Sequence, residues 1–325
     1  MKKFLFFFTA TFLSCGLVLS FGTYYKKIYR HYFGYYPYLE EYQIKKIETS
    51  SDYDTVFLGD SSLGNAVDTA TFDAVCGTRS LNLALTGIYG FYGDINYLER
   101  VLQNNPIRNV IIVHTLDTLG RAPDMRAYLA TSPFIVDKES LLRGLRKSLS
   151  DKRYSIFHNI LLLKTLVLEM LNFKDSIRGY LMLLGNDSFV QGDNVIVNDY
   201  HRQGHSLFDT TPLKFYASKA ISPSINPEQT DLLDALARIC LERKLNCIYA
   251  FGPLLNKLLD NSEPMIEASS LRIKVAGLSV VKDTPVGIPY EEIGDSIDHV
   301  APKAKEKFTR IYANLIKNYL ETKSK

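Results

Sequence analysis

The chain has 325 residues, of which 46% are hydrophobic and 22% are charged, and its formal net charge is +3. This length accommodates one sizeable α/β domain with an insertion, or two small domains. The nearly balanced charge argues against a dedicated nucleic-acid-binding protein, because such a protein carries a basic stripe.

The N-terminal segment is long and apolar. Residues 4–25 carry no charge and are flanked by Lys2-Lys3 and Lys26-Lys27. As a helix they extend about 33 Å, which is enough to cross a bilayer. We predict an uncleaved transmembrane anchor over residues 1–25, with a cleaved signal peptide or a lipoprotein signal at Cys15 as alternatives. The short Lys-Lys start favours a single-pass protein of the cell membrane whose domain is extracytoplasmic.

A tyrosine-rich segment follows. Eight of the 21 tyrosines lie between Tyr24 and Tyr42. Tyrosine favours the headgroup region of a bilayer, because its ring is apolar and its hydroxyl is polar. We therefore predict a juxtamembrane linker over residues 26–50. The alternative is a tyrosine-rich helix that packs on the domain.

The folded domain is predicted to span residues 51–325 and to begin with a nucleophile-like turn. A short apolar run, residues 56–58, indicates a buried strand and stops at Gly59-Asp60-Ser61-Ser62. In α/β enzymes a serine just past a buried strand is displayed as a nucleophile, next to backbone N–H groups that the turn leaves unbonded. The alternative is a plain strand-to-helix turn in which Asp60 or Ser61 only caps the next helix.

Strands and helices then alternate as far as residue 120. We predict a helix over 68–75, a strand over 80–85, a helix over 95–102 and a strand over 110–113. This alternation predicts a parallel sheet with helices on both faces, a three-layer α/β sandwich whose site lies beyond the carboxyl ends of the strands. His114, at that edge, is either a pocket residue or a hydrogen-bonded core histidine.

The middle of the chain, residues 121–224, is predicted to be a mostly helical insertion. Its most apolar stretch, residues 157–171, contains Lys164 and Glu169, which argue against a second membrane span. We predict a core helix of the insertion there. A helix that docks on the membrane is the alternative.

The α/β pattern resumes at Pro227, with a predicted helix over 228–243 and strands over 247–251 and 278–281. Cys240 and Cys247 are expected to be small core residues rather than part of a disulfide framework. The chain has no C-x-x-C motif, and we expect neither a metal site nor a cofactor.

A loop then delivers Asp295, Asp298 and His299 in front of a terminal helix that starts near Pro302. A serine hydroxyl becomes an effective nucleophile when a histidine takes its proton, and that histidine needs a carboxylate to fix its tautomer. Ser61 and His299 suit the first two roles. Asp295 is the favoured acid, because a directly adjacent side chain rarely reaches the ring nitrogen. Asp298 is the alternative.

These blocks resemble the SGNH (GDSL-type) hydrolase superfamily. Gly59-Asp60-Ser61 matches its first block, residues 82–87 resemble its second, and residues 295–299 resemble its D-x-x-H block. The resemblance implies Ser61 as the nucleophile, with the backbone N–H groups of Ser61 and Gly87 as oxyanion donors. The third block departs from the family, because Leu116 stands where the family has an asparagine. The residues expected near the pocket are Asp60, Asn82, His114 and Thr115.

The resemblance also implies a function. Membrane-tethered members of this superfamily modify cell-envelope polysaccharides, as in alginate O-acetylation and teichoic-acid D-alanylation, and the order of serine before Asp/His is that of the D-alanylation type. We expect a serine acyltransferase or esterase that acts on acyl groups, O-acetyl above all, of a cell-envelope polysaccharide or another acylated glycan. A membrane-bound O-acyltransferase would be its partner. The alternatives are a simple extracytoplasmic esterase or deacetylase, and a non-catalytic envelope scaffold, which Leu116 favours.

Overall fold

The computed structural model describes residues 37–132, 159–160, 164, 221, 223–294 and 296–321. The predicted transmembrane anchor, the first part of the predicted linker, almost all of the predicted insertion and Asp295 lie outside these residues. Among the described residues, no helix combines the length and the apolar character needed to cross a bilayer.

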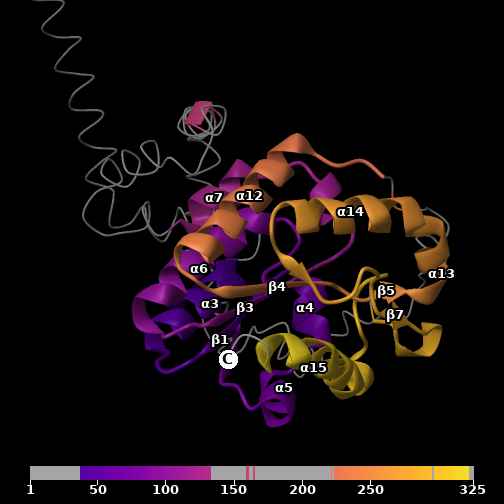
Figure 1. The fold of residues 1–325 in the computed structure, drawn as a ribbon, viewed down its shortest axis with the longest axis horizontal. Helices are drawn as coiled ribbons and strands as arrows, with labels where there is room; N and C mark the ends of the chain where they lie inside the picture. The colour runs from indigo at the N-terminus through magenta and orange to yellow at the C-terminus, as the bar shows by residue number, and fades with distance from the viewer. Residues whose placement is uncertain are drawn as a thin grey trace, which may run out of the picture.

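The centre of the domain is a parallel five-stranded sheet in the order β2-β1-β3-β4-β6 (Figure 1). This is one of the common strand orders of doubly wound α/β sheets, and it confirms the predicted parallel α/β architecture. Strands β1 and β4 are buried along their whole length, as expected for parallel strands covered on both faces. The strands are β1 (Thr55–Gly59), β2 (Ser80–Asn82), β3 (Asn109–His114), β4 (Asn246–Phe251) and β6 (Ser279–Val280).

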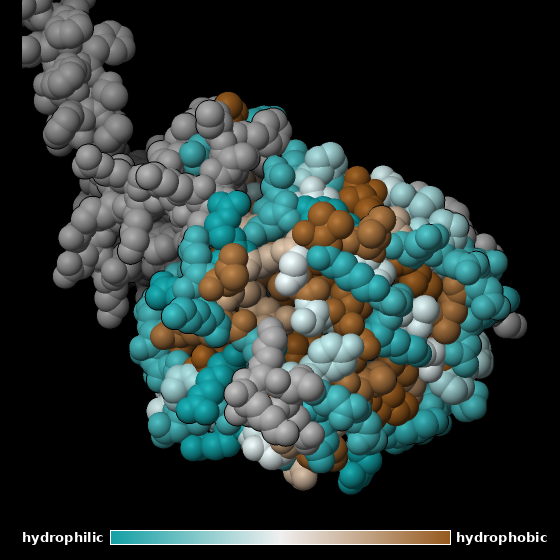
Figure 2. Space-filling view, in the orientation of Figure 1, coloured by the Kyte–Doolittle hydropathy of each residue, from teal (hydrophilic) through white to brown (hydrophobic). Residues whose placement is uncertain are grey.

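Two helical layers cover the sheet (Figure 1). Successive residues of a strand point to opposite faces, and so Val56 and Leu58 join one core cluster while Phe57 joins the other. Helices α14 and α15 belong to opposite layers. On the face of the molecule drawn in Figure 2, apolar residues gather between these two helices. One layer holds α3 (Pro37–Thr49), α6 (Gly90–Asn104), α7 (Met125–Thr131), α12 (Pro227–Glu242) and α14 (Glu263–Val275); the other holds α4 (Ser61–Ala66), α5 (Thr69–Cys76) and α15 (Lys305–Glu321).

Short elements complete the described part of the chain. Strand β5 (Leu254–Leu255) pairs in parallel with β7 (Gly287–Ile288) and lies outside the main sheet. The remaining turns of helix are α13 (Asn256–Leu259), η1 (Thr118–Gly120), η3 (Asp260–Ser262), η4 (Tyr290–Glu292) and η5 (Pro302–Ala304).

Helix α3 belongs to the packed domain. Its side chains Leu39, Ile44 and Ile47 are almost completely buried in the larger core cluster. Gln43 Nε2 donates to the Ala84 carbonyl at 2.8 Å, so that the helix is bonded to the segment after β2. Residues 37–49, which the sequence placed in a linker, therefore form a helix on the domain. This agrees with the alternative interpretation for that part of the segment.

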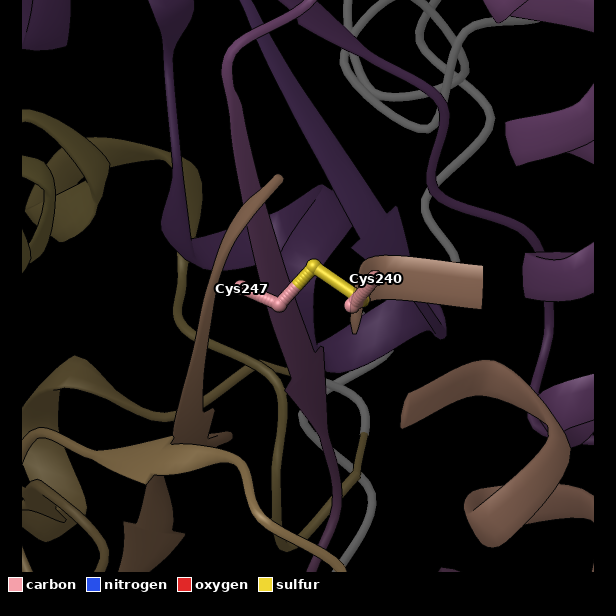
Figure 3. Close-up of a disulfide and its surroundings, with 2 residues drawn as sticks. All are labelled: Cys240 and Cys247. Atoms are coloured by element: carbon pink, nitrogen blue, oxygen red, sulfur yellow. A yellow bond between two sulfur atoms is a disulfide. The ribbon is translucent and has the colours of Figure 1, made fainter. Parts of the chain in front are cut away.

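A disulfide joins Cys240 near the end of α12 to Cys247 in β4 (Figure 3). The Cα atoms lie 6.0 Å apart, which is within the usual range for a disulfide. The expectation that these cysteines are unpaired core residues was wrong. The connection from α12 to β4 is short, and it brings the end of the helix next to the start of the strand. The sequence pattern of each element by itself does not show that the two cysteines meet.

Two differences from the predicted boundaries bear on the candidate site. Helix α6 begins at Gly90 rather than at residue 95. The second strand ends at Asn82, but Leu83 N–H still donates to Phe57 O and Leu85 N–H donates to Gly59 O. The chain therefore follows β1 to its carboxyl end before it turns into α6.

Candidate active site

Strand β1 ends in a turn that requires glycine. Gly59 has a φ of +152°, and a Cβ there would lie 1.8 Å from the carbonyl oxygen of Val113 in β3. The next residue, Asp60, caps α4, because its Oδ1 accepts from the Ser62 N–H at 2.9 Å. Ser61 is thereby the first residue of α4, directly beyond the carboxyl end of β1.

The hydroxyl of Ser61 and the imidazole of His299 lie within hydrogen-bond distance. Ser61 Oγ is 2.8 Å from His299 Nε2, although the two residues are 238 positions apart in the sequence. Both side chains are partly exposed. A general base must reach the proton that it removes, and this distance satisfies that requirement. The structure therefore brings the predicted nucleophile and the predicted base together.

Backbone bonds hold the loop that carries His299. The His299 carbonyl accepts from the Gly294 N–H at 2.7 Å, and the His299 N–H donates to the Ser296 carbonyl at 3.2 Å. Helix α15, which follows this loop, is bonded to α4 by Lys305 Nζ, which donates to the Gly64 carbonyl at 2.5 Å. Ser61, at the start of α4, and His299, in the loop before α15, are thus held by two helices that contact each other.

The structure describes Asp298 but not Asp295, the two candidates for the acid that orients His299. Asp298 is buried, and its Oδ1 accepts from Ser296 Oγ at 2.5 Å. The same oxygen lies 3.8 Å from His299 Nε2, the nitrogen that faces Ser61. An orienting acid bonds the other ring nitrogen, and so this geometry does not give Asp298 that role. The favoured acid, Asp295, lies outside the described residues.

A buried cluster of two carboxylates and a histidine lies behind the nucleophile turn. His114 Nδ1 is 3.3 Å from Asp60 Oδ2, and His114 Nε2 is 2.5 Å from Asp94 Oδ2. Asp60 Oδ2 also accepts from the Thr115 N–H at 2.9 Å. His114 is 1% exposed, which agrees with the interpretation of His114 as a hydrogen-bonded core histidine. The cluster joins the ends of β1 and β3 to α6.

The titration of this cluster follows from its burial. Burial lowers the pKa of His114, but Asp94 and Asp60 outweigh that effect and raise it to about 10. Burial favours the neutral form of Asp60, yet the bonds to His114 hold the pKa of Asp60 far below its ordinary value. Burial raises the pKa of Asp94. Asp60 therefore carries a negative charge, and His114 is protonated between the two carboxyl groups.

The other residues expected near the pocket are also buried and bonded to the protein. Asn82 Oδ1 accepts from the Ala84 N–H at 2.9 Å, and its Nδ2 donates to the Val67 carbonyl at 3.2 Å. Thr115 is 4% exposed. Asn82 and Thr115, together with Asp60 and His114, thus hold the strand ends in place and do not form an open pocket wall.

Gly87, the predicted oxyanion donor, contacts a residue that sequence reasoning missed. A Cβ on Gly87 would lie 1.9 Å from Arg121 Nη1, so the guanidinium rests on the face of this glycine. Arg121 Nη2 donates to Asp117 Oδ1 at 2.7 Å. Burial lowers the pKa of Arg121, but Asp117 and Asp60 outweigh that effect and raise it, so the guanidinium is charged. Leu116, in the position of the family's asparagine, is 2% exposed and packs in the core.

Neither Arg121 nor Asp94 carried a local signal. Asp94 lies in the first turns of α6 between aromatic residues, where helical periodicity marks only the apolar positions. The i,i+4 spacing of Asp117 and Arg121 could have been noticed, but such pairs are common and usually lie on a solvated surface.

No protein-family model, no curated protein and no solved structure matches this chain. The resemblance to SGNH hydrolases therefore rests on the sequence blocks alone.

Proposed function

We propose that the protein is an SGNH-like serine acyltransferase or esterase that acts on acyl groups of cell-envelope polysaccharide. The observation that carries the proposal is the 2.8 Å contact between Ser61 Oγ and His299 Nε2 at the carboxyl edge of a parallel sheet. Such an edge is where open α/β sheets place their functional sites.

In the proposed mechanism Ser61 Oγ attacks the acyl carbon while His299 Nε2 accepts the serine proton. The backbone N–H groups of Ser61 and Gly87 stabilise the oxyanion. His299 then returns the proton to the leaving alcohol, and an acyl-serine remains. Water or a sugar hydroxyl, activated by His299, resolves that ester. Asp295 is the proposed orienting acid.

The burial of the two groups supports a catalytic role over a purely structural bond. A structural serine–histidine bond gains most in a closed core, whereas both Ser61 and His299 are partly exposed. The fully buried histidine of this edge is His114, which is bonded on both ring nitrogens. His114 is thus a structural histidine, whereas His299 is partly exposed, as a histidine that acts on a substrate must be.

Two features support an envelope location. The apolar residues 4–25 fit a membrane anchor. The disulfide between Cys240 and Cys247 is typical of an oxidising compartment outside the cytosol. With the anchor, this favours polysaccharide or another acylated glycan of the envelope as substrate, and a membrane-bound O-acyltransferase as acyl source. Both assignments follow the likeness to tethered SGNH proteins.

The same site would serve a simple esterase or deacetylase, and a non-catalytic scaffold is the remaining alternative. Leu116 favours the scaffold. This buried leucine stands where the family has the asparagine that donates to the oxyanion, and leucine has no side-chain donor. Loss of one such donor costs about 3 kcal/mol of transition-state stabilisation.

A fluorophosphonate probe tests the proposal on the full-length chain in detergent. We expect a single adduct that maps to Ser61 and is lost in Ser61→Ala and His299→Ala. Ser62 and Ser296, which lie beside the site and are bonded to Asp60 and Asp298, serve as internal controls and stay unmodified. A folded wild-type protein without an adduct on Ser61 would contradict a catalytic serine and favour the scaffold.

A further inference from the structure

Arg121 lies beside Gly87, the proposed oxyanion donor, and has N–H groups that are available to bind a ligand. Nη1 lies against Gly87, where it occupies the space that a Cβ would need. Of the three guanidinium nitrogens, only Nη2 has a hydrogen-bond partner in the described part of the chain, the Asp117 carboxylate. The Arg121 side chain is 37% exposed. Nη1 and Nε can therefore donate to a bound group.

The guanidinium is influenced by acids from both halves of the site. It interacts electrostatically with Asp60, the residue before the nucleophile, and with Asp298, the residue before the base. The hydrogen bond from Nη2 to Asp117 Oδ1 holds one edge of the guanidinium in place. Because the guanidinium is planar and rigid, fixing Nη2 also fixes the direction of Nη1.

We propose that Arg121 is a catalytic residue that donates from Nη1 to the oxyanion, in place of the asparagine that Leu116 replaces. The inference rests on the proposed function of Ser61 and His299. Arg121 would supply the side-chain oxyanion donor that the proposed function so far lacks. The site could then operate although Leu116 is buried in the core.

The step balances without any further reactant. Ser61 Oγ forms a bond to the acyl carbon, its proton moves to His299 Nε2, and the carbonyl π electrons move to the acyl oxygen. Arg121 Nη1 donates a hydrogen bond to that oxygen and keeps its proton. When the carbonyl re-forms, the alkoxide leaves and takes the proton from His299. A charged donor at the developing charge stabilises the transition state more than the neutral ester.

Hydrolysis of p-nitrophenyl acetate by the full-length chain in detergent provides the test. Arg121→Ala is expected to lower kcat by about 10²- to 10³-fold, the usual effect of losing one oxyanion donor, while KM changes little. Arg121→Lys should regain part of kcat, and free guanidinium should partly rescue Arg121→Ala. Arg310 forms the same kind of i,i+4 pair, with Glu306, on the exposed face of helix α15, so Arg310→Ala is the matched control and should keep wild-type kcat.

The outcomes separate this inference from the proposed function. If the wild type cleaves the ester and Arg121→Ala keeps kcat within threefold, or changes KM alone, Arg121 is not an oxyanion donor and Ser61 remains the nucleophile. If Arg121→Ala unfolds, Arg121→Met gives the decision through its kcat, because methionine fills a similar space without an N–H donor: a folded Met variant with wild-type kcat overturns the donor role. A folded wild type that neither cleaves the ester nor is labelled at Ser61 overturns both proposals.

Discussion

Asp60 and His114 are bonded to each other where the neighbouring strands β1 and β3 end, and Asp60 is directly followed by the candidate nucleophile Ser61. Asp60 Oδ1 caps α4 while Oδ2 faces His114, so one carboxylate serves both the helix and the cluster. The position of Ser61 therefore depends on a charge pair that is shielded from water, and salt in the solvent should screen that pair only weakly.

Removal of His114 should destabilise the domain strongly. In His114→Ala the carboxylates of Asp60 and Asp94 stay buried without their cation, and the free energy of unfolding should fall by about 3–5 kcal/mol. Urea titration followed by circular dichroism measures this. The double variant His114→Ala/Asp94→Asn should recover part of the loss, because it removes one of the two stranded charges. A single variant as stable as the wild type would contradict the charged cluster.

The same pair predicts a pH dependence of stability. The pKa of His114 is raised from 6.5 to about 10 in the folded state, so its contribution is complete below about pH 6.5 and is lost as the pH rises through about 10. Lys46 acts in the opposite sense. Burial lowers its pKa from 10.5 to about 8, and so stability rises between those values. The difference between wild type and His114→Gln isolates the histidine.

Thermal unfolding between pH 6 and pH 10 measures that difference. It should be largest near pH 6 and should shrink towards pH 10, whereas a Lys46→Met background should leave the difference unchanged. A difference that stays constant with pH would show that His114 is not protonated in the folded protein.

The two candidate acids can be separated by neutral substitutions. Asp295→Asn should lower kcat for p-nitrophenyl acetate by about 10⁴-fold, because the amide fixes the wrong tautomer of His299. Asp298→Asn should cost less than about tenfold, because Asp298 lies on the Nε2 side and is bonded to Ser296. The reverse order of the two effects would assign the acid role to Asp298.

Loss of the disulfide should lower stability moderately. The bridge closes a loop with a sequence separation of 7, for which chain entropy gives roughly 2–3 kcal/mol. Calorimetry of Cys240→Ser/Cys247→Ser should show a matching fall in Tm, and a reducing agent should have the same effect on the wild type. Cys76→Ser serves as the control, because Cys76 is not part of the bridge. Peptide mapping without reduction should recover the linked peptides.

Two glycines with positive φ form a matched pair. At Gly59 a Cβ would lie 1.8 Å from a backbone oxygen of the neighbouring strand, while at Gly77, the C-cap of α5, nothing lies within 4 Å. Gly77→Ala should cost about 1 kcal/mol, the strain of the left-handed region alone. Gly59→Ala should cost about 4 kcal/mol or more, because the strands must separate. Equal effects on the urea midpoint would contradict the close approach of β1 and β3.

Local patterns in the sequence predicted the strands of the sheet and the candidate catalytic pair. The apolar runs at 56–58, 110–113 and 247–251 predicted three strands, because continuous burial is a property that each segment shows by itself, and the structure places them side by side. Ser61 could be selected because it follows such a strand and His299 because it precedes the terminal helix, and because their blocks resemble one family. The carboxyl ends of parallel strands lie at one edge of the sheet, whereas the distance of 2.8 Å between Ser61 Oγ and His299 Nε2 is a result of the tertiary structure.

Only the tertiary structure decided the partners of these residues. Asp94, His114 and Asp60 come from three different elements and meet because β1 and β3 are neighbours and α6 covers them. The contact of Arg121 with Gly87 and the Cys240–Cys247 bridge depend in the same way on how connections return to the sheet. Periodicity reports whether a position is buried. Which polar groups meet depends on strand order and register, and these result from packing of the whole chain.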